Sequence, residues 1–118
     1  RVFLETMGEV RTIVGDRPVF VHSFPSVPPE IVYFFADLRP GPILLNVMTM
    51  IFNSRTQELF LEHMERHCRE FQALVGSDPA AREVQIFKRC HPDATQVEKK
   101  IAGSPYFVLL SKDVTAAQ

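Results

Sequence analysis

Residues 54–75 carry the pattern that most constrains the fold. Ser54 followed by Gln57 is a capping box, which satisfies free backbone N–H groups at the start of a helix. At about 100° per residue from Phe60 onward, one side of such a helix collects Met64, His67, Phe71, Leu74 and Val75. The opposite side carries Glu58, Glu62, Glu65 and Arg69. The pattern predicts one amphipathic helix over 54–75 that ends at Gly76.

Shorter patterns predict the elements that precede this helix. Strand-forming side chains on both sides of Gly15-Asp16-Arg17 predict a β-hairpin over 9–24. Residues 29–38 are expected to form a helix, because one apolar stripe collects Ile31, Phe34, Phe35 and Leu38. A strand over 31–35 is the alternative. Residues 43–52 are apolar on both alternating faces, which favours a central strand, with a short buried helix as the alternative.

The segments after residue 76 are shorter still. Partial alternation of apolar side chains predicts a strand over 83–90. Asp93 with Gln96 is typical of a helix start, so a short helix is expected from there to Gly103. A final strand is expected over 106–110, and residues 115–118 are expected to fray.

Length and composition agree with one folded unit built from these elements. The chain has 118 residues, 46% hydrophobic and 23% charged, which is the profile of a globular domain. Strands and helices alternate after the hairpin. We therefore expect a single α+β domain over 1–118, a mixed β-sheet with an N-terminal hairpin and two to three helices packed on it. Because the chain begins with Arg1 rather than Met, we expect either a processed product or a piece of a longer chain.

Charge and cysteine content exclude several classes of protein. The formal net charge of −1 argues against nucleic acid as a partner, which requires a basic face. The longest apolar stretch, 43–52, is about half the roughly 20 residues that a membrane span needs.

Cys68 and Cys90 stand apart without a CxxC motif. Free thiols in an intracellular, reducing compartment are the simpler interpretation, and a single Cys68–Cys90 bridge is the alternative.

One cluster has the residue types of a ligand or metal site. His63 and His67 are four residues apart and share a helix face, with Glu70 on the same side. With Cys90 or His91 they would provide acceptable ligands for zinc. Glu65 lies on the opposite face, so the metalloprotease arrangement does not apply. The alternative is that His67 is a hydrogen-bonded core histidine and His63 a boundary residue, with no cofactor bound. His22 is expected to be structural.

Aromatic residues suggest a second kind of site. Tyr33, Phe34, Phe35 and the run 43–52 provide more apolar surface than a thin sheet needs, which is typical of an interface or a ligand cavity. The chain contains no G-x-S-x-G elbow and no glycine-rich phosphate loop. We therefore expect a non-enzymatic protein-interaction or assembly domain, which binds a protein partner or itself as a homo-oligomer. The alternative is a small-molecule-binding or enzymatic domain with an apolar pocket and His67 or His63 as its polar handle.

The alternative has support from the order of elements over 43–111. That order is strand, long helix, strand, short helix and a segment beginning Gly103-Ser104-Pro105-Tyr106-Phe107. It resembles the ferredoxin-like subunits of dimeric α+β-barrel proteins, such as antibiotic-biosynthesis-type monooxygenases. Residues 1–42 have no counterpart in that arrangement. The resemblance implies a dimer with a small-molecule pocket.

Overall fold

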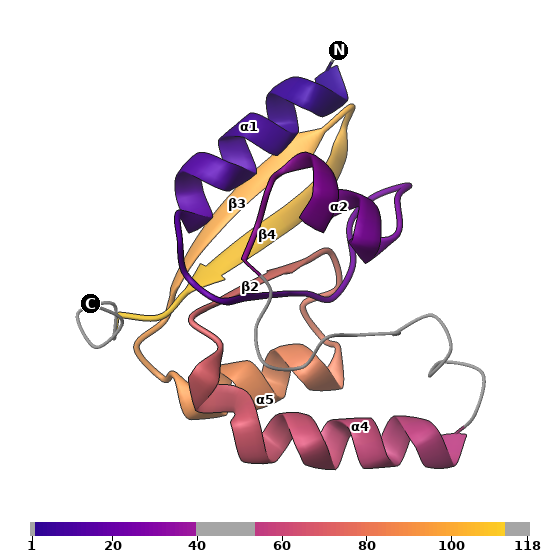
Figure 1. Ribbon diagram of the computed structural model, residues 1–118, viewed down its shortest axis with the longest axis vertical. Helices are drawn as coiled ribbons and strands as arrows, with labels where there is room; N and C mark the ends of the chain where they lie inside the picture. The colour runs from indigo at the N-terminus through magenta and orange to yellow at the C-terminus, as the bar shows by residue number, and fades with distance from the viewer. Residues whose placement is uncertain (1, 40–53, 113–118) are drawn as a thin grey trace.

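The computed structural model describes residues 2–39 and 54–112. In chain order its helices are α1 (Val2–Val14), α2 (Pro29–Phe35), α4 (Ser54–His67) and α5 (Arg82–Cys90), with a short 3₁₀ helix, η1 (Cys68–Glu70), directly after α4. Its strands are β1 (Val19–Val21), β2 (Ala73–Gly76), β3 (Thr95–Ile101) and β4 (Ser104–Leu110). Figure 1 shows the arrangement. The α+β fold class and the mixed sheet with helices packed on it are confirmed.

The four strands form one sheet in the order β1-β2-β4-β3. β1 runs parallel to β2, whereas β2 and β3 each pair with β4 in antiparallel fashion. A two-residue loop joins β3 to β4, and both its residues have positive φ, Ala102 at 49° and Gly103 at 85°. That conformation matches the right-handed twist of a hairpin. Gly103 is therefore a hairpin residue rather than the end of a helix.

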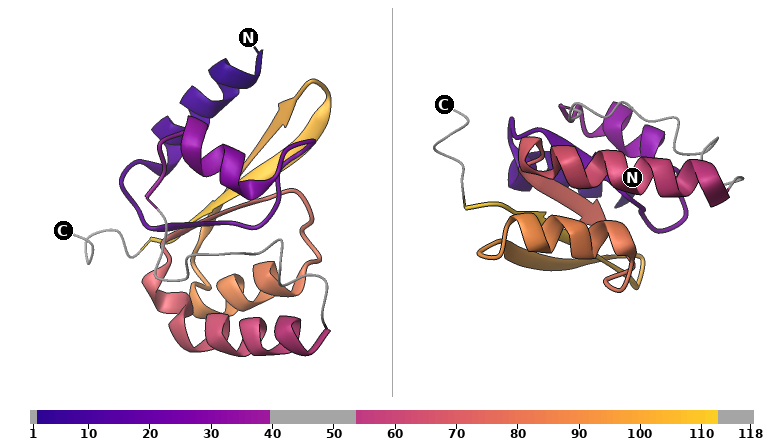
Figure 2. Two further views of the ribbon diagram at one scale, coloured as in Figure 1. Left: turned by 45° about the vertical axis from the view of Figure 1, so that its right-hand side comes forward. Right: turned by 90° about the horizontal axis from the view of Figure 1, so that it is seen from below.

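Helices cover both faces of the sheet (Figure 2). Alternate strand residues point to opposite sides, so Val19, Val21, Val75 and Val108 pack with α1 and α2. Their neighbours pack with α4 and α5: Phe20, Leu74, Phe107 and Leu109. The sheet thus separates two apolar cores, each closed by one pair of helices. None of the described helices is both long and apolar enough to cross a membrane.

The N-terminal expectation requires a correction in its first half. The turn at Gly15 and a strand at Val19–Val21 lie where the hairpin was expected. Residues 9–14, however, continue helix α1. Met7, Val10 and Val14 are all buried, and their spacing places them on one helical stripe. The apparent strand-like alternation covers only the five residues 10–14, whereas the helical spacing of the buried residues runs from Met7 to Val14.

The long helix is also shorter than expected. α4 begins at Ser54 as expected but ends at His67, and η1 follows it. Leu74 and Val75 belong instead to β2, where they pair with both β1 and β4. These two apolar side chains appeared to continue the helical stripe, but they are strand residues. A central strand is buried on both faces, so it carries apolar side chains at consecutive positions.

Two predictions near the C-terminus were wrong. Residues 82–90 form helix α5 rather than a strand, with Glu83 in its first turn and Lys88 and Arg89 in its last, as the helix dipole favours. Residues 95–101 form strand β3 rather than a helix. The element order on which the dimeric-barrel resemblance rested is therefore not observed over 82–101. The strand expected at 106–110 is confirmed within β4, and the helix expected over 29–38 is present over Pro29–Phe35. The expectations for 43–52 and 115–118 lie outside the described residues.

The two cysteines are joined rather than free. Cys68 in η1 and Cys90 at the end of α5 form a disulfide, with their Cα atoms 6.3 Å apart. The bond ties α4 and η1 to α5. This corrects the expectation of free thiols, and the disulfide gives no support to a reducing compartment.

Candidate functional site

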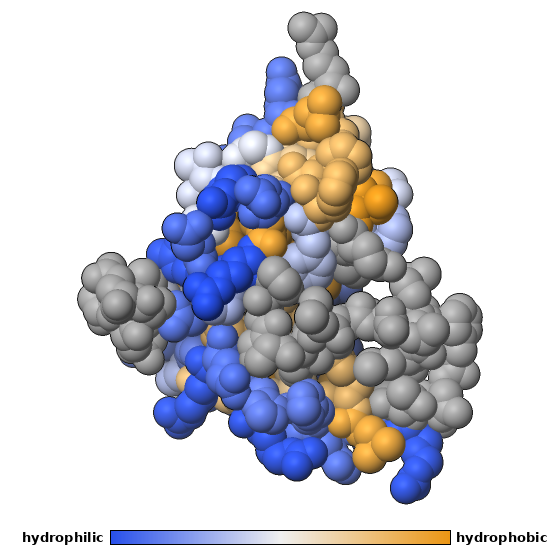
Figure 3. Space-filling model, viewed as in Figure 1, coloured by the Kyte–Doolittle hydropathy of each residue, from blue (hydrophilic) through white to orange (hydrophobic). Residues whose placement is uncertain are grey.

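An apolar surface lies on the helices that cover the first face of the sheet. Val2 and Leu4 at the start of α1 are 56% and 59% exposed, and Phe34 and Phe35 in α2 are 76% and 48% exposed. The rings of Phe34 and Phe35 meet edge-on at 5.0 Å between centroids, and Phe35 contacts the ring of Phe3 at 5.6 Å. We call these five residues the Phe34 surface. Figure 3 shows apolar residues gathered over this end of the molecule.

The exposure of Phe34 and Phe35 follows from how α2 is anchored. Val32 and Ala36 are buried one helical turn apart, so the helix presents a different face to the core than the expected stripe. Tyr33 fixes this orientation. Its hydroxyl donates to the carbonyl of Val19 at 3.0 Å and accepts from the N–H of Val21 at 2.9 Å.

Those two bonds occupy backbone groups of edge strand β1 that would otherwise lack partners. Burial raises the pKa of Tyr33 to about 12, while the hydrogen bond from Val21 opposes the shift. The phenol therefore remains a neutral donor.

A shallow hollow adjoins the Phe34 surface. Its volume is about 280 Å³, and its apolar lining comes from Val2, Phe3, Pro25, Val27 and Ile101. Ile101 belongs to β3 and Val27 to the segment before α2, so three parts of the chain meet here. The hollow extends the apolar character of the Phe34 surface toward the β3–β4 turn.

The histidines singled out from the sequence lie together on α4. The rings of His63 and His67 are 4.4 Å apart between centroids. Nδ1 of His67 lies 2.6 Å from a carboxylate oxygen of Glu70. His63 is exposed and His67 is half-buried. Helical spacing thus correctly brought His63 and His67 together, whereas Glu70 comes from η1 and His67 is half-exposed rather than a core histidine.

The two proposed partners from α5 are held elsewhere. Cys90 is committed to the disulfide, and His91 is buried, with Nε2 donating to the carbonyl of Cys68 at 3.1 Å. Over residues 2–39 and 54–112, no group of three His, Cys, Asp or Glu side chains is placed to hold a metal ion. The zinc set of His63, His67 and Cys90 or His91 is not assembled in this part of the chain.

Sequence reasoning missed a polar cluster at one edge of the sheet. Nδ1 of His22 lies 3.2 Å from the hydroxyl of Ser23, and Nε2 lies 3.2 Å from a carboxylate oxygen of Glu83. The Ser23 hydroxyl is 3.0 Å from the Ser77 hydroxyl and accepts the Ser77 N–H at 3.0 Å. Four side chains from three segments therefore form one hydrogen-bonded chain.

The electrostatics of Glu83 belong to this cluster. Burial alone would raise its pKa, but several favourable interactions outweigh that effect and leave the pKa below its ordinary value. The hydrogen bond and positive charge of His22 are the main ones, helped by a backbone N–H and by Arg82. Glu83 is thus held as a carboxylate that accepts from His22.

The sheet topology explains how the cluster forms. His22 and Ser23 follow β1, and Ser77 follows β2, so both lie at the carboxyl ends of the two parallel strands. Open sheets that contain parallel strands bind ligands at this edge. The sequence does place polar residues directly after two apolar runs, and this could have indicated the cluster. Bringing them together, however, requires knowing that β1 pairs with β2 in parallel. A comparison with protein-family models, curated proteins and solved structures finds no match to this chain.

Proposed function

We propose that this chain is a self-associating interaction domain that pairs with a second copy through the Phe34 surface. The single observation that carries the proposal is the exposure of Phe34, which is 76% accessible in a helix whose Val32 and Ala36 are buried. Contiguous apolar side chains rimmed by polar ones are typical of interaction sites. Aromatic residues are enriched at such interfaces, because they bury large areas at small cost in conformational entropy.

Charge favours a second copy as the occupant. The formal net charge is −1, so two copies repel each other only weakly at long range. Exposed acidic side chains, Glu5 and Glu9, lie on α1. The exposed Lys99 lies on β3 on the face that α1 covers, since it pairs with Tyr106 of that core. In a two-fold pair each copy presents the same patch. The acidic side chains of one copy can then face Lys99 of the other.

The energetics make the phenylalanines decisive. Fully burying an exposed phenylalanine contributes roughly 1.5–3 kcal/mol. Association costs at least about 4 kcal/mol in lost translational and rotational freedom. A pairing built on this surface therefore needs several of its apolar side chains at once, and the loss of one ring is expected to weaken it strongly.

Light scattering on Phe34→Ser tests the proposal. Leu59→Ser is a matched control, because Leu59 is a large apolar residue 52% exposed on α4. We expect dimers for the unchanged chain and for Leu59→Ser, and monomers for Phe34→Ser with an unchanged circular dichroism spectrum. Equal masses for all three proteins would overturn the proposal.

A further inference from the structure

The polar cluster at the carboxyl ends of β1 and β2 has a direction, which the hydrogen-bonding capacity of each group determines. Glu83 is a carboxylate and can only accept, so Nε2 of His22 donates to it. When the His22 ring is neutral, Nδ1 is an acceptor, and the Ser23 hydroxyl 3.2 Å away can donate its proton to it. Each proton in the cluster thus points toward Glu83.

The second serine completes the chain. In this arrangement the single proton of Ser23 lies on the contact with His22, so across the 3.0 Å contact between the two hydroxyls Ser77 donates and Ser23 accepts. Ser23 also accepts the Ser77 N–H, which occupies its remaining lone pair. Ser77 is therefore the hydroxyl oxygen in this cluster with lone pairs left for another molecule.

We propose that Ser77 is a nucleophile for acyl-ester hydrolysis, activated through Ser23 by His22 and oriented by Glu83. A serine hydroxyl becomes reactive when a base can take its proton as it attacks. Here the Ser77 oxygen forms a bond to the ester carbonyl carbon, its proton passes to Ser23, and the Ser23 proton passes to His22. The C–O bond to the alcohol then breaks, and His22 returns a proton through Ser23 to the leaving alkoxide. Water then attacks the acyl carbonyl carbon and passes its proton through Ser23 to His22. The C–O bond to Ser77 breaks, the Ser77 oxygen regains a proton from His22 through Ser23, and the acid is released.

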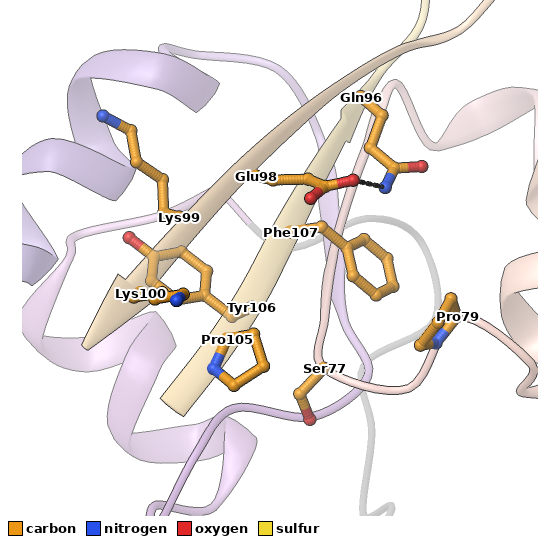
Figure 4. Close-up of a pocket in the computed structure, with 9 residues that line it drawn as sticks. All are labelled: Ser77, Pro79, Gln96, Glu98, Lys99, Lys100, Pro105, Tyr106 and Phe107. Atoms are coloured by element: carbon orange, nitrogen blue, oxygen red, sulfur yellow. Dashed lines mark hydrogen bonds between the residues drawn. The ribbon is translucent and has the colours of Figure 1, made fainter. Parts of the chain in front are cut away.

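The surroundings of Ser77 indicate the class of substrate. Ser77 lines a pocket of about 550 Å³, within the range that holds small molecules. Pro79, Pro105 and Phe107 give the pocket an apolar wall. Gln96 and Glu98 lie at the end away from Ser77, and Lys99 and Lys100 also line the pocket (Figure 4). An ester with a short apolar acyl group fits this lining. The pocket shares no residue with the Phe34 surface or with His63 and His67, but Lys99, which the pairing proposal uses, also lines it.

A fluorophosphonate probe, which labels activated serine hydroxyls, tests the proposal together with hydrolysis of p-nitrophenyl butyrate. We expect the probe on Ser77, identified by tandem mass spectrometry, and measurable release of p-nitrophenol. Ser77→Ala and His22→Ala should each lose both signals. Glu83→Gln should retain labelling at a rate lowered at least tenfold. Ser104→Ala is a matched control, because Ser104 is an exposed serine at the start of β4, and it should behave like the unchanged chain.

The results that would contradict the proposal can be told apart from one another. No labelling of the folded chain, or labelling that survives His22→Ala, would overturn the proposal, and labelling of Ser23 would overturn the choice of Ser77. Circular dichroism establishes that each variant is folded. If Ser77→Ala is unfolded, Ser77→Cys keeps a group of similar size. Reactivity should then move to a thiol-directed probe and still depend on His22.

Discussion

The hydroxyl of Tyr33 donates to the carbonyl of Val19 at 3.0 Å and thereby sets the rotation of α2 on the sheet. The same hydroxyl accepts from the N–H of Val21. With Tyr33 held inward, its neighbours Phe34 and Phe35 have no place in the core and face outward. The exposed aromatic surface is thus a consequence of how β1 satisfies the backbone groups of its outer edge.

Replacing Tyr33 by Phe tests this anchor. The variant leaves one backbone donor and one backbone acceptor of β1 without their partner, so the free energy of unfolding should fall by about 1–3 kcal/mol. Urea denaturation measures the change. Tyr106→Phe is the matched control, because the Tyr106 hydroxyl is buried and has no hydrogen-bond partner in the described part of the chain. That variant should be as stable as the unchanged protein or more so; a larger loss for Tyr106→Phe than for Tyr33→Phe would contradict the account.

Alkaline titration tests the burial of the same phenol. The pKa of Tyr33 is raised from 10.0 to about 12 in the folded chain. A raised folded pKa means that the contribution to stability is complete below pH 10 and is lost as pH rises through 12, by about 3 kcal/mol in total. Ultraviolet titration of Tyr106→Phe follows Tyr33 alone, since the chain has two tyrosines. A midpoint near 10 in the folded protein would be inconsistent with this environment.

Acid should weaken the link between His22 and Glu83. The pKa of Glu83 is lowered from its ordinary 4.5, so its contribution to stability is complete above that value. It is lost as pH falls through the lower, folded-state pKa. Glu83→Gln is expected to be less stable than the unchanged chain near neutral pH and to lose less stability on acidification. Parallel pH profiles for the two proteins, from thermal melting, would show that Glu83 does not interact in this way.

Reduction of Cys68–Cys90 should destabilise the α4 and α5 side. The bond closes a loop with a sequence separation of 22, for which loss of the cross-link costs roughly 3 kcal/mol by the chain-entropy relation. Thermal melts with and without a phosphine reductant should differ accordingly. Cys68→Ala/Cys90→Ala should melt at one temperature whether or not the reductant is present. An unchanged melt of the native chain, with thiol release confirmed, would contradict the structural role of the bond.

Long amphipathic patterns predicted more of this fold than short ones did. Ser54 and the stripe through Met64 correctly predicted the start and the buried face of α4, because many turns repeat the same period. The segments at 82–90 and 95–101 were exchanged, since nine and seven residues fit either period. Their assignment depends on tertiary packing, in which β3 pairs with β4 and α5 covers Phe20 and Leu74.

The candidate sites also differ in how far apart their residues lie in the sequence, and only the contacts between nearby residues could be predicted. His63, His67 and Glu70 lie together because helical spacing is local and can be counted. The sequence pattern groups Tyr33 with Phe34 and Phe35 as surplus apolar surface, yet the two hydrogen bonds of its hydroxyl make Tyr33 an anchor rather than part of the Phe34 surface. The contact of Ser23 with Ser77 spans 54 residues. It arises from the parallel pairing of β1 with β2, which no local pattern encodes.

Hydroxyl-radical footprinting at low and high protein concentration tests the role of the Phe34 surface most directly. If two copies pair through it, oxidation of Phe34 and Phe35 should fall as concentration rises, while oxidation of Leu59, which is 52% exposed on α4, stays constant. The accompanying mass should change from monomer to dimer over the same range. Unchanged oxidation of Phe34 in a sample that is already dimeric would contradict the account, because the two copies would then meet on another face.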